Sequence, residues 1–567
     1  MSTRPGTRTL GAAATLESLK KEAKRWLKAL REDDAAARER LRRVLPNAGT
    51  ELALREVQHA LALEHGLNGW TALKEALADR ALARRSPSER ADDFLRHAID
   101  RASGPLAAHI LLKHPDVAQF SVHTAVVAGD LAEVERRLAR DASAASTAGG
   151  PQSWQPLQYL CYARVPFAES SQHAVGIAHA LLDAGADPKA TWKDDWNNPF
   201  TLVTGVIGAG EGRAPPHPHA VALAELLLER GADPYDTQSM YNTSLHADDT
   251  FWLDFLYSRS DAAGDADRWR SKDAWPTSGM LDYLIGNAVS RNHLKRTRWL
   301  LEHGAHATAP HSYSKRNLHT EAILGGFTEL AQLLVEFGAQ PEPLDDTHAF
   351  QAACMRGDHD EARHLLAARP ELRRFPGPMY QAADRDRVDV AELLLELGVS
   401  PDVEHGGWAA LHSCAHNNSL RVAKLLIERG ATIDLREKRF KSTPLGHAVW
   451  AGQHEMVELL SAVSRDVIAL TRAGKLERLR TLLAEEPNLA QATREGRTAL
   501  YFLSAPEERA VEIAELLLGR GVDPKFKDAD NLTAADAAAK LGLEELAALL
   551  RDAESGQEAG AGSSKLL

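Results

Sequence analysis

The sequence predicts an all-α solenoid of about 14 helix-pair units, preceded by a small helical domain. Three observations lead to this fold class. The chain has 567 residues, which is too many for one hydrophobic core. Its 44% hydrophobic and 26% charged residues are typical of a folded globular protein. A Leu-Leu motif followed by glycine recurs at intervals of about 33 residues, and such a period indicates a repeat array.

The second half of each repeat is predicted to be a helix that ends at a glycine. The segment Glu225-Leu-Leu-Leu-Glu-Arg-Gly-Ala-Asp-Pro234 recurs as Lys424-Leu-Leu-Ile-Glu-Arg-Gly-Ala431. Gly304 and Gly338, which close two successive copies, are 34 residues apart. Glycine readily adopts the left-handed conformation that closes a helix, and Asp-Pro then turns the chain away from it.

The first half of each repeat is predicted to be a shorter helix with its own start signal. Thr443-Pro444-Leu445 places a capping hydroxyl before a proline at the first helical position, and Ala410-Leu411-His412 is a looser version. Two antiparallel helices and a turn, with these motifs in phase, resemble the ankyrin repeat over residues 91–552. The resemblance implies a stack whose concave face recognises other proteins.

The ends of the array are predicted from changes in composition. Residues 531–550 keep helical spacing without a following Gly-Ala-Asp, as expected of a C-terminal cap. Residues 553–567 are rich in Gly, Ser and Ala, so we expect a disordered tail. Residues 1–14 are expected to form a flexible N-terminus.

Residues 15–90 are predicted to form a small basic helical domain. Residues 1–90 carry 18 Lys and Arg against 12 Asp and Glu, a balance of +6. The segments Leu19-Lys-Lys-Glu-Ala-Lys24 and His65-Gly-Leu-Asn-Gly-Trp-Thr-Ala-Leu-Lys74 resemble the N-terminal module of a group of bacterial ankyrin-repeat proteins. This resemblance implies a bacterial cytosolic origin and carries over no activity.

Charge and cysteine content narrow the classes of partner and compartment. The net charge of −12 argues against a general nucleic-acid binder, and the −18 outside residues 1–90 favours a basic partner. No window approaches 18 uninterrupted apolar residues, so no membrane span is expected. The cysteines Cys161, Cys354 and Cys414 are scattered, which favours a reducing, cytoplasmic location.

Three insertions interrupt consecutive repeats, at residues 164–172, 208–219 and 258–277. A solenoid usually carries its specific function in such insertions, because the repeats themselves serve packing. We therefore expect the three insertions to meet in space and to form a site.

Aromatic residues are concentrated in the same stretch, where six of the 11 tryptophans lie between residues 154 and 275. One interpretation is an aromatic-walled pocket for a protein partner or a small molecule. Another is that the large rings pack the long loops down. The candidate ligand-binding residues are Trp154, Tyr159, Trp192, Trp196, His219, Tyr241, Asn242, Trp252, Trp275 and Tyr283.

A catalytic function is the alternative to a binding scaffold. No Walker loop, dinucleotide fingerprint or Gly-x-Ser-x-Gly motif is present. An aspartate enclosed by tryptophan would bind its proton more tightly, which would permit cofactor-independent acid/base chemistry by an isomerase, lyase or hydrolase. The candidates are Asp195, Asp254 and His246.

The histidines are expected to serve the fold, and neither a metal nor a cofactor is predicted. His412 and His416 are four residues apart, a spacing that can hold a metal on a helix. However, His412 and His123 occupy the consensus histidine position of the repeat, where the ring resembles those that hydrogen-bond backbone between neighbouring repeats.

Overall fold

The predicted all-α fold class is confirmed by a computed structural model of the chain. No helix in the described part of the chain is long and apolar enough to span a membrane. The structure describes the whole sequence apart from residues 1–7, 9, 12–13, 47, 50–51, 53, 101–102, 167–170, 211–212, 246, 273–275, 277, 505 and 557–567.

Four helices precede the repeats and share one hydrophobic core. The side chain of Trp26 is buried there, and its indole N–H donates to the carbonyl of Ala37 at 3.0 Å. The Arg40 guanidinium lies over the Trp26 ring and binds Glu22 and Glu64 at 2.6 Å each. The helices are α1 (Leu16–Arg31), α2 (Ala35–Val44), α3 (Leu54–Glu64) and α4 (Trp70–Arg84).

The ends of the chain fall largely outside the described residues. Where the N-terminal segment is described, it is bound to the helices, because Arg80 donates to the carbonyl of Gly11 at 2.8 Å. At the other end, α32 (Glu544–Ser555) continues into the segment where a tail was expected. The predicted flexibility of residues 1–7 and 557–567 lies outside the described residues.

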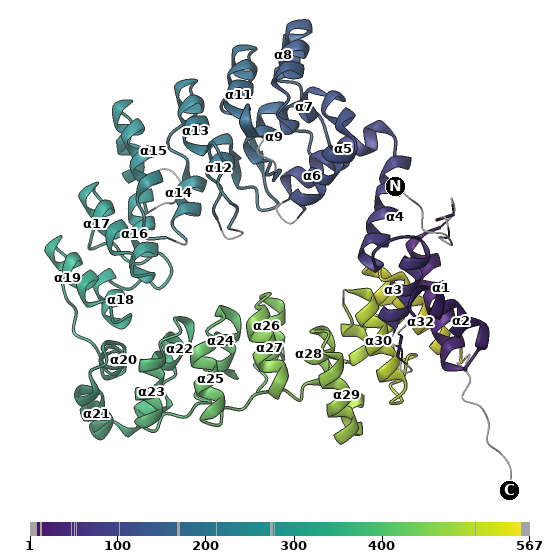
Figure 1. The fold of residues 1–567 in the computed structure, drawn as a ribbon. Helices are drawn as coiled ribbons and strands as arrows, with labels where there is room; N and C mark the ends of the chain where they lie inside the picture. The colour runs from purple at the N-terminus through teal and green to yellow at the C-terminus, as the bar shows by residue number, and fades with distance from the viewer. Residues whose placement is uncertain are drawn as a thin grey trace. The chain divides into compact units, whose positions relative to one another are not determined.

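Contacts divide the chain into two compact units. Unit 1 consists of residues 1–288 with 302–305, and unit 2 consists of residues 289–301 with 306–567. Within each unit, helices pair as the repeats predict, and successive pairs stack side by side in two rows (Figure 1).

In unit 1, α7, α9, α12 and α14 form one row, and α8, α11, α13 and α15 form the other (Figure 1). The elements after α4 are α5 (Pro87–Ile99), α6 (Gly104–Lys113), η1 (Pro115–Gln119), α7 (Val122–Ala128), α8 (Leu131–Arg140), η2 (Ala142–Ala145), α9 (Pro156–Tyr162), α11 (Ala174–Asp183), β1 (Thr191–Lys193), β2 (Pro199–Thr201), α12 (Leu202–Ile207), α13 (Ala220–Glu229), α14 (Thr237–Thr243), α15 (Phe251–Ala262), η3 (Ala266–Arg270) and α16 (Met280–Ser290), the last of which ends in unit 2.

In unit 2, α20, α22, α24, α26 and α28 form one row, and α21, α23, α25, α27 and α29 form the other (Figure 1). The elements before α32 are α17 (Leu294–Glu302), α18 (Leu318–Leu324), α19 (Thr328–Glu336), α20 (Asp346–Arg356), α21 (His359–Ala368), η4 (Pro370–Arg374), α22 (Gly377–Asp384), α23 (Val388–Glu396), β3 (Glu404–His405), β4 (Trp408–Ala409), α24 (Ala410–Asn417), α25 (Leu420–Glu428), α26 (Pro444–Trp450), α27 (His454–Val463), α28 (Val467–Arg472), α29 (Leu476–Glu485), η5 (Pro487–Gln491), β5 (Thr493–Arg494), β6 (Arg497–Thr498), η6 (Ala499–Phe502), α30 (Glu507–Leu518) and α31 (Ala534–Lys540).

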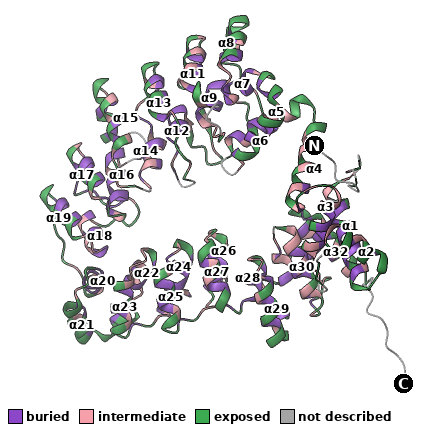
Figure 2. Ribbon diagram, viewed as in Figure 1, coloured by how far each residue is buried: buried purple, intermediate pink, exposed green. Residues whose placement is uncertain are grey.

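The closing glycine, the Leu-Leu motif and the capping threonine of the repeats lie at the helix ends and in the core, as predicted. Gly430 follows α25 with a φ of +85°, and Leu426, from the Leu-Leu motif of that helix, is fully buried. The hydroxyl of Thr443 accepts the backbone N–H of Gly446 and caps α26. Buried residues lie where paired helices face one another, and exposed residues cover the outer sides of the helices (Figure 2).

Short antiparallel hairpins join some of the repeats. Strand β1 pairs with β2 so that Trp192 lies opposite Phe200. Strand β3 pairs with β4, and β5 pairs with β6. These hairpins hold the turns between repeats in fixed shapes, so their side chains have defined neighbours.

Candidate functional site

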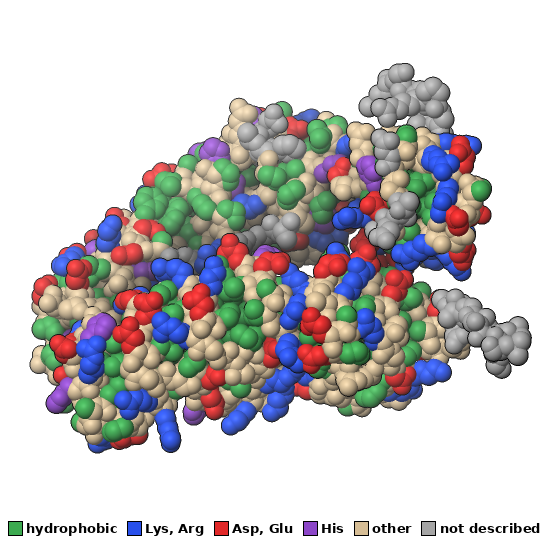
Figure 3. Space-filling model, turned by 60° about the horizontal axis from the view of Figure 1, so that its bottom comes forward, with side chains coloured by type: hydrophobic (Ala, Val, Ile, Leu, Met, Phe, Trp, Pro, Cys, Tyr) green, Lys and Arg blue, Asp and Glu red, His purple; other side chains and the backbone are tan. Residues whose placement is uncertain are grey.

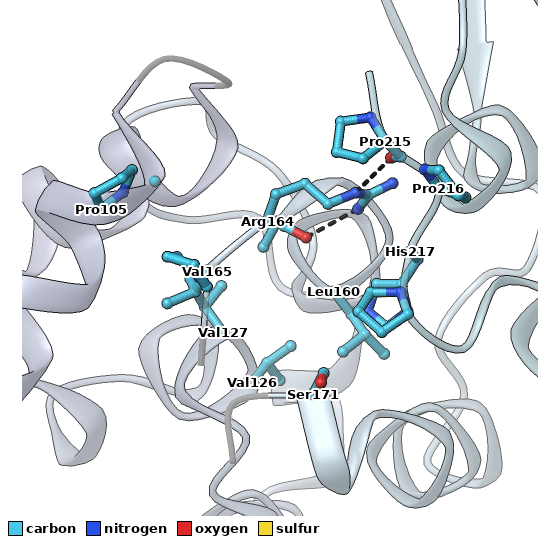
Figure 4. A pocket seen from close by; sticks show the side chains of 14 residues that line it. Pro105, Val126, Val127, Leu160, Arg164, Val165, Ser171, Pro215, Pro216 and His217 are labelled. Atoms are coloured by element: carbon cyan, nitrogen blue, oxygen red, sulfur yellow. Dashed lines mark hydrogen bonds between the residues drawn. The ribbon is translucent and has the colours of Figure 1, made fainter. Parts of the chain in front are cut away.

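The first two insertions meet and enclose a pocket of about 350 Å³ in unit 1 (Figure 4). Residues 164–172 separate α9 from α11, and residues 208–219 separate α12 from α13. The pocket, here called the insertion pocket, is lined by Gly104, Pro105, Val126, Val127, Leu160, Ala163, Arg164, Val165, Pro166, Ser171, Pro215, Pro216, His217 and Pro218. The third insertion, residues 258–277, contributes no described residue to this lining.

Arg164 ties the two insertions to the repeats between them. Its Nε donates to the carbonyl of Pro215 at 2.9 Å, and its Nη2 donates to that of Gly205 at 2.6 Å. Its Nη1 donates to the carbonyls of Cys161 and Ala163, each at 2.9 Å. These are neutral acceptors, and the described residues place no carboxylate against the guanidinium. No described side chain therefore neutralises the positive charge at this wall of the pocket.

Two glycines permit the close approach of backbone segments around Arg164. A Cβ on Gly104 would lie 2.5 Å from the carbonyl oxygen of Arg164, and one on Gly208 would lie 2.7 Å from that of Pro215. Gly208 also has a φ of +70°, which side chains with a Cβ rarely adopt. The backbone N–H of Arg164 donates to the carbonyl of Ala98 at 2.7 Å, which holds the first insertion against α5. The pocket wall is consequently fixed by the backbone.

His217 supplies a second polar group to the pocket, and its tautomer follows from its neighbours. Its Nδ1 accepts the backbone N–H of His219 at 3.1 Å, so the proton of the neutral ring is on Nε2. Burial, together with the charge of Arg164, lowers the pKa of His217 to about 3. Burial also lowers the pKa of Arg164 to about 10, which leaves the guanidinium charged at neutral pH. The ring is therefore neutral and has an N–H to donate.

The chemistry of the insertion pocket favours one kind of ligand group. Valine, leucine and proline side chains form most of its walls, and the two polar groups discussed are a cation and an N–H donor. Such a surface attracts a hydrogen-bond acceptor or an anion attached to an apolar body.

The predicted ligand-binding tryptophans Trp154 and Trp192 lie in a ladder of packed rings beside this region. Trp154 is 5.4 Å from Tyr159 and 5.4 Å from Trp192, measured between ring centroids. Trp192 in turn stacks on Phe200 at 4.6 Å. Tyr159 is fully buried, and its hydroxyl donates to the carbonyl of Gly149 at 3.1 Å. These are the contacts expected if the rings pack the long loops down.

Trp196 and Asp195 lie at the tip of the β1–β2 hairpin, where the structure does not enclose them. Trp196 is 85% exposed, and Asp195 is also exposed. Desolvation raises the pKa of the adjacent Asp194, but hydrogen bonds from Asn198 and Trp196 together bring it below its usual range. The acid/base hypothesis required an aspartate enclosed by tryptophan, and Asp195 does not meet that condition.

The other described candidates lie further along unit 1. Trp252 packs edge-on against Phe255 at 5.2 Å, while Asp254 on the same helix, α15, is exposed. The rings of Tyr241 and Tyr283 lie 6.3 Å apart. The contact of Trp252 is thus local to α15, whereas Tyr241 and Tyr283 join α14 to α16.

Asn242 contacts the second insertion and His219 is its last residue, but neither lines the insertion pocket. Asn242 is buried, and its Nδ2 donates to the carbonyl of Gly208 at 3.3 Å. His219 precedes α13, and its backbone N–H orients His217. Trp275 and His246 lie outside the described residues. None of the predicted ligand-binding residues that are described belongs to the lining of the insertion pocket.

The residues that form the insertion pocket were only partly visible in the sequence. The expected meeting of insertions was the useful signal, because it gave the location of the first two. Arg164 was missed, since nothing in the sequence shows that its partners are carbonyls from residues 205 and 215. His217 lies within the second predicted insertion, but it is not among the candidate residues that the sequence singled out.

The consensus histidines of the repeats are buried structural groups. His123 contacts the carbonyl of Thr147 at 3.0 Å through its Nε2. His412 is fully buried, and its Nδ1 accepts the backbone N–H of Ala409 at 3.1 Å. Burial, with the neighbouring His447, lowers the pKa of His412 to about 4.

Comparison with known proteins identifies the repeats. Residues 349–437 and 379–469 match the family model "Ankyrin repeats (3 copies)". Ankyrin repeat and SOCS box protein 16 from Homo sapiens is 35% identical over 127 residues, which are 22% of this chain and 28% of that protein. A putative ankyrin repeat protein from Rickettsia felis is 26% identical over 171 residues, which are 27% of this chain and 73% of that protein.

One solved structure matches part of the chain. An ankyrin repeat domain from Acinetobacter baumannii AYE shares 25% sequence identity over 31% of this chain and 97% of that domain, with a TM-score of 0.25. The chain spans less than a third of the length of the first curated relatives it matches, at 28%, 31% and 29%.

Proposed function

Because the chain is an ankyrin-repeat protein, we propose that it is a binding scaffold whose insertion pocket receives an apolar segment of a partner protein that carries one carboxylate. Ankyrin repeats commonly bind protein partners, which supports the general part of this proposal. The observation that carries the specific part is the charge of Arg164, which no carboxylate among the described residues neutralises, at the wall of a mostly apolar pocket.

Both the walls and the polar groups of the insertion pocket favour binding of such a segment. Apolar walls favour burial of an aliphatic or aromatic side chain at roughly 25 cal/mol per Å² removed from water. A carboxylate beside Arg164 would neutralise a charge that is partly buried among carbonyls. The N–H of His217 would donate to an oxygen of the same ligand. A pocket of about 350 Å³ is large enough for a side chain and too small for a folded surface element.

The test selects ligands without assuming a natural partner. A displayed library of random 12-residue peptides is selected on the full chain, and the selected peptides are synthesised and titrated by fluorescence polarisation. The variant Val165→Glu places a carboxylate in the pocket beside Arg164, so we expect it to weaken binding about tenfold or more. Val221→Glu is the matched control, because Val221 is 42% exposed on α13 and does not line the pocket.

The selected peptides distinguish the outcomes. We expect them to share an apolar residue near a carboxylate, and to bind the Val221→Glu variant within about twofold of the unchanged chain. Peptides that bind both variants equally would contradict a role for the insertion pocket. Selection of uniformly basic peptides would contradict the role of Arg164.

A catalytic function gains no support from the described residues. Asp195 and Asp254 are exposed, and His246 lies outside the description. We therefore base the proposal on binding alone.

A further inference from the structure

A second pocket of about 470 Å³ lies in unit 2, within consecutive repeats. The loop that connects α25 to α26, the helix α26, the end of α28 and the strand β5 contribute to it. This arginine pocket is lined by Trp408, His416, Arg439, Phe440, Ser442, Gly446, His447, Trp450, Arg472 and Arg494.

Aromatic side chains form exposed walls of the arginine pocket. Trp450 is 67% exposed and stacks on His416 with ring centroids 5.8 Å apart. Phe440 is 55% exposed at the tip of its loop. Trp408 is more buried, and it contacts His447 edge-on at 4.8 Å. Large aromatic groups left open to water in one pocket are typical of residues that a ligand covers.

Three arginines of this pocket have no carboxylate partner among the described residues. Arg472 is exposed at the end of α28, and Arg439 lies over the Phe440 ring at 4.9 Å. Arg494 lies over the Phe502 ring at 4.6 Å. By contrast, the nearby Arg436 is paired with Asp466 at 3.3 Å, so carboxylates are available in this part of the unit.

Arg494 gives a second, independent indication of a ligand-binding site. Its Nε is buried and has no hydrogen-bond acceptor within the described part of the chain. A buried donor without a partner is destabilising, because it has lost its hydrogen bond to water without gaining an acceptor. Burial also lowers the pKa of this guanidinium. An incoming anion would satisfy the donor and stabilise the charge.

The loop that carries Arg439 and Phe440 is ordered by one buried carboxylate. Glu437 accepts the backbone N–H groups of Arg439, Phe440 and Ser442 at 2.5, 2.7 and 3.2 Å. The backbone N–H of Lys438 donates to the carbonyl of Gly406, which joins this loop to the preceding hairpin. The loop is therefore held in place before any ligand arrives, so little ordering is required on binding.

We propose that the arginine pocket binds an acidic peptide segment of a partner protein in which carboxylates neighbour an aromatic side chain. The three unpaired guanidiniums supply charge complementarity for the carboxylates. Trp408, Phe440 and Trp450 supply the surface for the aromatic side chain. The choice of a peptide rests on the proposed scaffold function, whereas the choice of an acidic aromatic ligand rests on the pocket.

The charge of the array favours a short anion over an extended one. A balance of −18 outside residues 1–90 repels a long polyanion such as nucleic acid, while a local cluster of three arginines attracts a compact one. On the face drawn in Figure 3, basic and acidic side chains are interspersed and do not form one extended basic surface. The basic partner predicted from net charge alone therefore does not match this pocket.

The experiment uses the full chain and a defined probe. A fluorescein-labelled peptide of eight residues alternates glutamate with phenylalanine, and a second peptide has glutamine at each glutamate position. We expect fluorescence anisotropy to show binding of the glutamate peptide, at least about tenfold tighter than that of the glutamine peptide. Raising NaCl from about 50 to about 500 mM should weaken the binding several-fold, since salt screens the arginines.

Single substitutions then locate the site. Arg472→Gln and Trp450→Ala remove exposed side chains and should each weaken the glutamate peptide about tenfold. Arg363→Gln on α21 and Phe337→Ala after α19 are the matched controls, being exposed in the same unit and outside the pocket. Because these changes affect exposed positions, each variant is expected to keep the unfolding transition of the unchanged chain.

The outcomes support or overturn the assignment. Equal effects of the pocket variants and their controls, or equal binding of the two peptides, would overturn it. Complete displacement of the probe by an equal concentration of inorganic phosphate or ATP would show a site for small anions and would overturn the peptide assignment. The Val165→Glu variant should bind the glutamate peptide normally, so the insertion pocket can fail its own test without affecting this result.

Discussion

In the insertion pocket, Arg164 donates to four backbone carbonyls, whereas in the arginine pocket Arg439, Arg472 and Arg494 line one cavity and have no carboxylate partner among the described residues. The same side chain therefore has two roles in one array. Half-buried and surrounded by carbonyls, Arg164 fixes the shape of a site and offers a ligand mainly its charge. Arg439 and Arg472 are exposed, and Arg494 keeps a donor without an acceptor among the described residues, so these side chains have N–H groups left for a ligand. This difference teaches that hydrogen-bond accounting, more than residue type, shows how far an arginine serves the fold and how far it can serve a ligand.

The largest expected difference in stability is between a variant that lacks Arg164 and one that lacks Arg472. Arg164→Met leaves the carbonyls of α9, of α12 and of the second insertion without this donor, so we expect the free energy of unfolding to fall by about 3–4 kcal/mol. Arg472→Met should change it by less than about 0.5 kcal/mol, since this side chain is exposed. Urea unfolding followed by circular dichroism measures both values. Similar losses in the two variants would remove the distinction between the pockets.

Replacing a tryptophan in unit 1 should also lower the free energy of unfolding more than replacing one in the arginine pocket, but the difference should be smaller than for the arginines. Trp192 is stacked on Phe200 within a ladder of rings, so Trp192→Ala should lower the free energy of unfolding by about 3 kcal/mol. Trp450 is 67% exposed, and Trp450→Ala should lower it by less than about 0.5 kcal/mol while it weakens the acidic peptide. If Trp192→Ala left the free energy of unfolding unchanged, the ring would not be needed for packing, and a role in ligand binding would be favoured.

The smallest expected effect is a pH dependence. His217 is neutral in the folded chain because its pKa is lowered to about 3, while the unfolded chain binds a proton below about pH 6.5. The stability that neutral His217 contributes is therefore fully present above about pH 6.5 and is lost progressively as the pH falls toward 3. At pH 5 the loss in the free energy of unfolding amounts to about 2 kcal/mol. His217→Gln should remove this part of the acid sensitivity.

His447 provides the comparison in the arginine pocket. Burial lowers the pKa of His447, but Glu437, whose Oε1 is 3.8 Å from its Nε2, opposes the shift. We therefore expect His447→Gln to relieve less acid sensitivity than His217→Gln does. Unfolding measured between pH 7.5 and 5 tests the order of the two variants, and the reverse order would contradict it.

The repeat could be predicted from the sequence because it depends on local signals repeated in phase. The glycine after each Leu-Leu motif and the threonine before Pro444 act within one turn of their own helices. The meeting of the first two insertions also followed from their positions in consecutive repeats. In each case the residues that interact are close in the sequence or occupy equivalent positions in neighbouring repeats.

The chemistry of the pockets could not be predicted, because it depends on contacts between residues far apart in the sequence. Arg164 meets carbonyls at residues 205 and 215, and these acceptors carry no side-chain signature. The surplus of tryptophan was a real feature, but rings such as Trp192 pack against other rings, and Trp196 lies exposed at a hairpin tip. Composition indicated where aromatic residues gather and not what they face.

The bonds of Arg164 also bear on how unit 1 opens. A stack of repeats can fray one repeat at a time, because each contacts mainly its neighbours. Arg164 binds carbonyls of α9, of α12 and of the insertion before α13, so these repeats cannot separate without breaking the same group of bonds. Amide protons from α9 to α12 should therefore exchange with solvent as one cooperative block, slower than those of repeats that lack such a bridge.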